Sequence, residues 1–194
     1  MIFNDPYCYP GTDILRNKPD IRDKERLWQF EFRKTAERSM ELQESPVVGR
    51  FDLAHLQAIH SYLFQDLYAW AGKIRTVDMS KGSTFFAHHA AIQNYADKQV
   101  FPAIVRDKLL VALDKPIFVK RLAYHFAEIN ALHPFREGNG RSTRQFVEQL
   151  ARHAGFDLDY TKVAQNDWVD AAIASFSGNL VPMENVFTMI TGKQ

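Results

Sequence analysis

The sequence predicts an all-α domain, a helical bundle that carries one small β-hairpin. Apolar residues recur with helical spacing through most of the 194 residues. One stretch, residues 74–88, instead has β-branched and aromatic residues on either side of a glycine turn, which is typical of a hairpin. With 46% hydrophobic and 13% aromatic residues, the chain can bury a core, which excludes a disordered protein. We expect residues 1–45 to form an N-terminal extension and helix, and residues 46–194 the main domain, in one compact unit.

Charge and cysteine content exclude several classes of protein. The 24 basic and 23 acidic residues leave a net charge of +1, without the basic excess of a protein that binds nucleic acid directly. The single cysteine, Cys8, cannot form an intramolecular disulfide, which fits a reducing compartment. No apolar run is long enough for a signal peptide or a membrane span. We therefore expect a cytoplasmic protein with no membrane partner.

The first predicted helix covers about residues 22–43 and ends at Ser45-Pro46, because the residue before proline disfavours helical geometry. Its apolar stripe consists of residues four apart: Trp28, Phe32, Ala36 and Met40. Asp52 is the expected N-cap of the second helix, which runs to about Leu67.

Gly72 ends the helical pattern and leads to the hairpin, whose tip is Lys81-Gly82-Ser83. Another helix is expected over about residues 90–110, bent or split at Pro102. A further helix begins near Pro116, with one apolar face formed by Phe118, Leu122, Phe126 and Ile129.

His133-Pro134 interrupts that helix, and a loop follows to Gly140. The next helix continues to about His153. We expect two more helices, one around residues 168–176 and a last one after Pro182.

Residues 133–144, HPFREGNGRSTR, combine several groups that suit phosphate chemistry. Gly138 and Gly140 allow a tight turn, after which the amides at the start of a helix favour an anion. Arg141 and Arg144 are three residues apart on that helix, so both can bind phosphate oxygens.

Glu137 offers the hard oxygen ligand that Mg²⁺ prefers, and His133 can accept a proton near neutral pH. Each feature alone has an ordinary structural explanation, such as a turn or a solvated helix face. Their conjunction predicts a site for phosphoryl or nucleotidyl transfer.

This segment resembles the active-site motif of Fic-domain proteins, His-x-Phe-x-(Asp/Glu)-Gly-Asn-Gly-Arg-x-x-Arg, with every specified position filled. Residues 51–75 are similar to the family's first core helix and the lead-in to its flap hairpin. The resemblance extends over about residues 51–190, whereas residues 1–45 match only loosely.

The resemblance implies a protein adenylyltransferase of the Fic fold, with ATP as co-substrate and Mg²⁺ as cofactor. His133 would be the general base, Phe135 a structural residue of the loop, and Glu137 the Mg²⁺ ligand. The residues expected to bind the phosphates are Gly138, Asn139, Gly140, Arg141 and Arg144. The hairpin at Lys81 and Gly82 would be the flap that holds the target by strand addition.

The family also suggests partners. The expected target is a protein that presents a Tyr, Ser or Thr hydroxyl, and type II topoisomerase subunits (DNA gyrase, topoisomerase IV) are candidates by analogy with short, stand-alone bacterial Fic toxins. Many Fic proteins carry an inhibitory (Ser/Thr)-x-x-x-Glu-(Gly/Asn) helix, but no Ser or Thr of this chain has Glu at that offset. We therefore expect a small antitoxin that supplies the glutamate to Arg144.

Two alternatives remain open. The same fold can transfer another nucleotide or a phosphocholine group, or remove AMP, and the chain could also be a binding module without turnover. Among other residues, His88-His89 could suggest a metal site, but adjacent imidazoles are expected to point apart. His55 and His60 do not share a helix face cleanly, and Cys8 lacks a neighbouring base.

Overall fold

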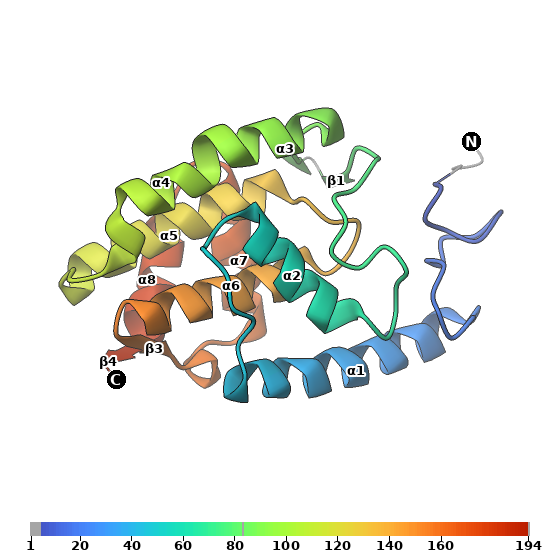
Figure 1. Cartoon of the computed structure of the whole chain (residues 1–194), viewed down its shortest axis with the longest axis horizontal. Helices are drawn as coiled ribbons and strands as arrows, with labels where there is room; N and C mark the ends of the chain where they lie inside the picture. The colour runs from blue at the N-terminus through green and yellow to red at the C-terminus, as the bar shows by residue number, and fades with distance from the viewer. Residues whose placement is uncertain (1–4, 83, 194) are drawn as a thin grey trace.

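The computed structural model describes residues 5–82 and 84–193, and helices account for most of them, as the sequence predicted. In Figure 1, α1 runs along one edge of the molecule and α3 and α4 along the opposite edge, with α5 and α6 between them. The helices are α1 (Lys24–Glu44), α2 (Leu53–Phe64), α3 (Ile92–Tyr95), α4 (Phe101–Arg106), α5 (Lys115–Leu132), α6 (Asn139–His153), α7 (Gln165–Phe176) and α8 (Val181–Ile190). The strands are β1 (Ser80–Lys81), β2 (Thr84–Phe85), β3 (Phe156–Leu158) and β4 (Thr191–Lys193).

The core forms where the predicted apolar faces meet. All four residues of the predicted face of α5 are buried, at 3% exposure or less. Asp52 caps α2 as expected, because its side chain accepts a hydrogen bond from the amide of His55 at 2.8 Å. The helix ends at Phe64, slightly before the predicted Leu67, although Leu67 is also fully buried.

The apolar stripe of α1 faces solvent. Trp28, Phe32 and Met40 are 61–68% exposed, whereas the buried positions of this helix are Leu27, Thr35 and Leu42. Polar contacts contribute to the attachment of α1: Arg38 forms a bidentate ion pair with Asp66, which lies just after α2. The four-residue repeat therefore predicted the position of the helix correctly, but the face that it identified is the solvent-exposed one.

The helical pattern expected over residues 90–110, bent or split at Pro102, is split, but before that proline and into more pieces than expected. A 3-10 turn (His89–Ala91) leads into α3, a π-helical turn (Ala96–Val100) separates α3 from α4, and a second 3-10 turn (Lys108–Leu110) follows. Pro102 lies in the first turn of α4, where it has no intrahelical hydrogen bond to lose. The regular α-helical hydrogen-bond pattern is instead interrupted at the π-helical turn just before α4.

Two small antiparallel sheets complete the fold. In the predicted hairpin, Ser80 pairs with Phe85 and Lys81 with Thr84, so its strands are shorter than the predicted span of residues 74–88. The other sheet pairs β3 with β4 and was not predicted, because two three-residue strands far apart in sequence give no local signal. The prediction of one small β-hairpin is confirmed, and the sheet of β3 and β4 is an addition to it.

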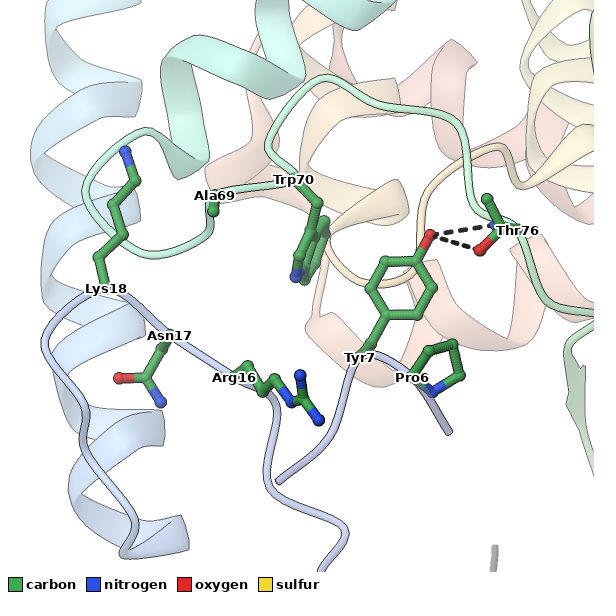
Figure 2. A pocket seen from close by; sticks show the side chains of 8 residues that line it. All are labelled: Pro6, Tyr7, Arg16, Asn17, Lys18, Ala69, Trp70 and Thr76. Atoms are coloured by element: carbon green, nitrogen blue, oxygen red, sulfur yellow. Dashed lines mark hydrogen bonds between the residues drawn. The ribbon is translucent and has the colours of Figure 1, made fainter. Parts of the chain in front are cut away.

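The segment before α1 is tied to the main body of the chain. Asp5 forms an ion pair with Arg136 at 2.7 Å, and the amide of Lys18 donates to the carbonyl of Leu67 at 2.7 Å. Between this segment and the chain after α2 lies a cavity of about 330 Å³, where the Tyr7 hydroxyl meets Thr76 (Figure 2). Its lining residues are Pro6, Tyr7, Arg16, Asn17, Lys18, Ala69, Trp70 and Thr76, none of which belongs to the 133–144 loop. Among the described residues, no helix combines the length and hydropathy that crossing a bilayer demands.

Candidate functional site

The loop between α5 and α6 contains the 133–144 motif, and a left-handed residue bounds it at each end. His133 ends α5 with φ 46° and ψ 60°, and its amide donates to the carbonyl of Ile129 at 3.2 Å. Gly138, with φ 81°, precedes the first residue of α6. These two left-handed residues reverse the direction of the chain. His133 therefore lies at the start of one short loop, and the N-terminus of α6 lies at its end.

Inside the loop, the side chain of Asn139 closes a ring of hydrogen bonds. Its Oδ1 accepts from the amide of Phe135 at 2.8 Å, and its Nδ2 donates to the carbonyl of Phe135 at 2.7 Å. Phe135 itself is fully buried, in line with the structural role expected for it. The amide side chain of Asn139 thus shapes the loop, and only its backbone remains to contact a ligand.

His60 supports the loop from α2. Its Nδ1 accepts from the amide of Gly72 at 2.8 Å, so Nε2 carries the proton and donates to the carbonyl of Glu137 at 2.9 Å. The ring also stacks on Phe135 with centroids 3.9 Å apart. Burial lowers the pKa of His60 to about 4, which keeps the imidazole neutral in this one tautomer. His60 is therefore a structural residue.

His133 presents a neutral imidazole with one free nitrogen. Its Nδ1 donates to the carbonyl of Asn130 at 3.3 Å, which leaves the lone pair of Nε2 available. The ring stacks on Phe86, just after β2, with centroids 3.6 Å apart. The pKa of His133 is lowered to about 4, mainly by burial and to a smaller extent by the nearby charges of Arg75 and Lys81. Such a group can accept a proton from a hydroxyl.

Arg75 lies beneath this site and is 1% exposed. Its Nε donates to the carbonyl of His133 at 2.8 Å, and its amide donates to the carbonyl of Pro134 at 2.8 Å. Its two terminal nitrogens donate to the carbonyls of Val77 and Ala87, which flank the hairpin. One buried guanidinium thus joins the motif loop to both ends of the hairpin.

Arg141 is bound by residues of α1. It donates to Glu31 at 2.5 Å, to Thr35 at 3.3 Å and, within the motif, to Glu137 at 3.3 Å. The other carboxylate oxygen of Glu31 accepts from the hydroxyl of Tyr68. Residues 1–45 therefore take part in orienting a motif arginine.

Arg144 has different surroundings. Its guanidinium lies over the ring of Trp168, 4.6 Å from the centroid, and 5.9 Å from that of Tyr160. Within the described part of the chain, no carboxylate pairs with it. Burial lowers the pKa of Arg144, which means that an anionic partner would be stabilising at this position.

Glu137 and the hairpin are the more accessible parts of the site. One oxygen of the Glu137 carboxylate accepts from the amide of Gly138 at 2.8 Å, and the side chain is 44% exposed. A single accessible carboxylate matches the way Mg²⁺ binds beside substrate phosphates. Lys81 and Gly82 form the exposed hairpin end, and the amide of Ala87 anchors the base of the hairpin to the Ala131 carbonyl of α5 at 3.2 Å.

The structure corrects one interpretation outside the motif. The rings of His88 and His89 do not point apart but stack with centroids 4.6 Å apart, and the carboxylate of Asp78 lies against both. His55 is buried and bonded to Gln149, as a structural residue would be.

Sequence reasoning singled out neither Glu31 nor any role for Arg75. A glutamate on a polar helix and an arginine before a hairpin carry no local signal of their partners. The match of residues 51–75 to the family pattern was the one hint for Arg75.

Comparisons with known proteins agree with this architecture. Over 176 residues the chain is 44% identical to protein adenylyltransferase VbhT of Bartonella schoenbuchensis, covering 91% of this chain but only 37% of that protein. It is 39% identical to the probable protein adenylyltransferase Fic of Escherichia coli, covering 97% of this chain and 93% of that protein.

Solved structures are similar over nearly the whole chain. The BepC protein of Bartonella tribocorum with bound AMPPNP is 29% identical, with a TM-score of 0.91 and 97% of each chain covered. The N-terminal Fic domain of a Bartonella quintana protein with bound ADP gives a TM-score of 0.92 at 29% identity, over 97% of this chain and 95% of that one. Residues 50–151 match the Fic/DOC family, so the chain belongs to that family and is an enzyme of the nucleotidyltransferase type.

Proposed function

We propose that this protein transfers AMP from ATP to a hydroxyl side chain of a target protein. The observation that carries the proposal is the neutral His133, whose Nε2 is free, on the same short loop as the N-terminus of α6. In the reaction, the target hydroxyl attacks the α-phosphorus while its proton passes to Nε2 of His133. The bond from the α-phosphorus to the bridging oxygen breaks, and pyrophosphate leaves.

The phosphates bind at the start of α6. The first amides of a helix have no intrahelical acceptor, so those of Asn139, Gly140 and Arg141 can donate to phosphate oxygens, whereas the amide of Gly138 donates to Glu137. The guanidinium groups of Arg141 and Arg144 then bind the β- and γ-phosphates. Negative charge from these phosphates raises the pKa of His133 in the complex, which makes the imidazole a better base there than in the free enzyme.

Glu137 is the proposed Mg²⁺ ligand. The bound ion would neutralise phosphate charge, and Glu137 would hold it with Oε2, since Oε1 accepts from Gly138 and Arg141. Glu137→Gln should lower transfer activity in a way that extra Mg²⁺ restores only partly, because an amide is a weaker ligand than a carboxylate. Undiminished wild-type activity after complete chelation of divalent ions would remove this role.

The hairpin acts as a flap that binds the target backbone by strand addition. Replacing Lys81 and Gly82 together should reduce transfer to protein more than it reduces ATP binding, since the flap orients the target and not the nucleotide. Transfer to the target at the wild-type rate would rule out this docking mode.

Regulation by a small antitoxin follows from the unpaired Arg144. Its guanidinium is partly buried against Trp168 without a carboxylate in the described residues, and the chain lacks the inhibitory sequence pattern. A partner about one helical hairpin in size would dock near α1, where Trp28 and Phe32 are exposed, and place a glutamate on Arg144. The purified chain alone should modify itself or its target, and a silent chain would show that the inhibitor is built in.

The decisive experiment compares ATP labelled at the α-phosphate with ATP labelled at the γ-phosphate, with purified DNA gyrase, topoisomerase IV and cell lysate as targets. AMP transfer predicts protein labelling from the α-label alone, and loss of that labelling in His133→Ala with ATP affinity retained in calorimetry. Labelling from the γ-phosphate would indicate a kinase reaction. Competition by other nucleotides or by CDP-choline would indicate a different transferred group, and binding of ATP without any label would indicate a binding module.

A further inference from the structure

Three side chains with metal-binding donors meet at the base of the flap, outside the motif loop. Asp78 lies just before β1, and His88 and His89 lie shortly after β2. The two ends of the flap therefore contribute one carboxylate and two imidazoles to the same point of the surface.

The distances between these donors are short. Oδ2 of Asp78 lies 3.2 Å from Nε2 of His88, and Oδ1 lies 2.9 Å from Nδ1 of His89. One donor atom from each residue can be chosen so that all three lie within 4.8 Å of one another. Metal–ligand bonds of about 2.0–2.2 Å place the ligands of a tetrahedral zinc ion at comparable separations.

We propose that Asp78, His88 and His89 form a binding site for a divalent transition-metal ion of the zinc type, which fastens together the two ends of the flap. The binding of this ion does not depend on AMP transfer.

The donor set selects the class of ion. Two imidazole nitrogens and one carboxylate oxygen suit Zn²⁺, Co²⁺ or Ni²⁺, whereas Mg²⁺ prefers oxygen ligands. The nearest fixed charge is the Arg75 guanidinium, with a terminal nitrogen 3.9 Å from Oδ1 of Asp78. This positive charge opposes a cation held by charge alone, so binding relies on direct coordination bonds from the two histidines.

Without an ion, hydrogen bonds occupy the same donors. Asp78 accepts from the amide and from Nδ1 of His89, at 2.8 and 2.9 Å. To coordinate an ion, His88 must move its proton to Nδ1, which costs the 3.3 Å hydrogen bond from the amide of Ala90. His89 must move its proton from Nδ1 to Nε2, and the coordination bond replaces its hydrogen bond to Asp78.

Binding of the ion should stabilise the closed flap. Its two strands share only two residue pairs, and below them the amide of Phe86 donates to the carbonyl of Met79 at 3.2 Å. So short a hairpin is marginally stable by itself. An ion held by residues from both ends closes the loop at its base, which should slow opening of the flap.

The first test is calorimetric titration of the untagged, chelator-treated full chain with ZnCl₂ in the presence of excess Mg²⁺, which occupies the Glu137 site. We expect saturable binding with one-to-one stoichiometry. Asp78→Asn and His89→Ala should each weaken it at least about tenfold, because even changes to a ligand's hydrogen-bonding partners cost that much. His153→Ala is the matched control, since it removes an exposed imidazole elsewhere and should leave binding unchanged.

Two further measurements separate loss of metal binding from unfolding and test the effect of the ion on the flap. Far-UV circular dichroism checks that Asp78→Asn, which keeps the side-chain shape, is folded. Hydrogen exchange should show the amides of residues 79–87 at least about threefold more protected with Zn²⁺ in the wild type, and unchanged in His89→Ala. No saturable binding to the wild type, or wild-type affinity in both Asp78→Asn and His89→Ala, would overturn the proposal while leaving AMP transfer untouched.

Discussion

The Nε of Arg75 donates a 2.8 Å hydrogen bond to the carbonyl oxygen of His133, across 58 residues of sequence. The same guanidinium binds the carbonyls of Val77 and Ala87 at the two ends of the flap. The position of the candidate base and that of the hairpin are therefore set by one buried side chain. Arg75 is a positioning residue, because it acts through the backbone of His133.

Arg75→Lys tests this relationship. A lysine keeps the charge but cannot donate to three carbonyls in the fixed geometry of a guanidinium. We expect the free energy of unfolding to fall by about 3 kcal/mol, as for the loss of two charge-assisted hydrogen bonds. In steady-state kinetics, kcat for transfer to protein should fall while KM for ATP stays within about twofold. Arg50→Lys, at an exposed position, is the control, and an Arg75→Lys enzyme with wild-type kcat would remove the positioning role.

Glu31→Ala tests the contact between α1 and the motif. Glu31 holds Arg141 at 2.5 Å and is 13% exposed, so its loss should leave Arg141 less well placed for a phosphate. We expect KM for ATP to rise roughly fivefold, which corresponds to about 1 kcal/mol for one ion pair. Glu37→Ala is matched to it, because Glu37 lies on the same helix but pairs with Lys34 at the surface. Equal KM values in the two variants would contradict the proposed role of Glu31.

Gly138→Ala should destabilise the fold. A Cβ atom there would lie 2.1 Å from Cζ of the buried Phe64, and φ is +81°. Gly155 has a similar φ of +86° with nothing within 4 Å of its Cβ position, so Gly155→Ala measures the backbone strain alone. In urea unfolding, Gly138→Ala should lose about 1–3 kcal/mol more than Gly155→Ala, the usual cost of overpacking. Equal losses would mean that Phe64 moves aside freely.

The two buried histidines predict how stability changes with pH. His60 and His133 have pKa values near 4 when folded and an ordinary value of 6.5, so between these values the unfolded chain binds more protons than the folded one. Stability should therefore fall as the pH is lowered from 6.5 to 4, by about 3 kcal/mol at most for each histidine. Urea unfolding at several pH values measures this slope, and His133→Ala should reduce it. A wild-type slope that His133→Ala leaves unchanged would show that His133 is not buried as a neutral ring.

The sequence alone determined the helical class, most helix positions and the composition of the motif. These depend on local patterns: the i, i+4 face of α5, the Asp52 cap, and the two glycines of the loop are properties of neighbouring residues. The family was likewise identifiable from twelve consecutive residues, because their chemistry is concentrated in one loop.

Only the tertiary structure decided which contacts surround that loop. The pairing of Glu31 with Arg141, the Arg75 bond to His133, the Trp168 ring beneath Arg144 and the joining of Asp78 to His88 and His89 all connect residues that the chain brings together by folding. The outward stripe of α1 has the same origin. An amphipathic repeat shows which residues share a helix face, but whether that face is buried depends on what the rest of the fold places against it. In α1, polar and charged side chains on the face opposite the apolar stripe contact α6 and the chain after α2.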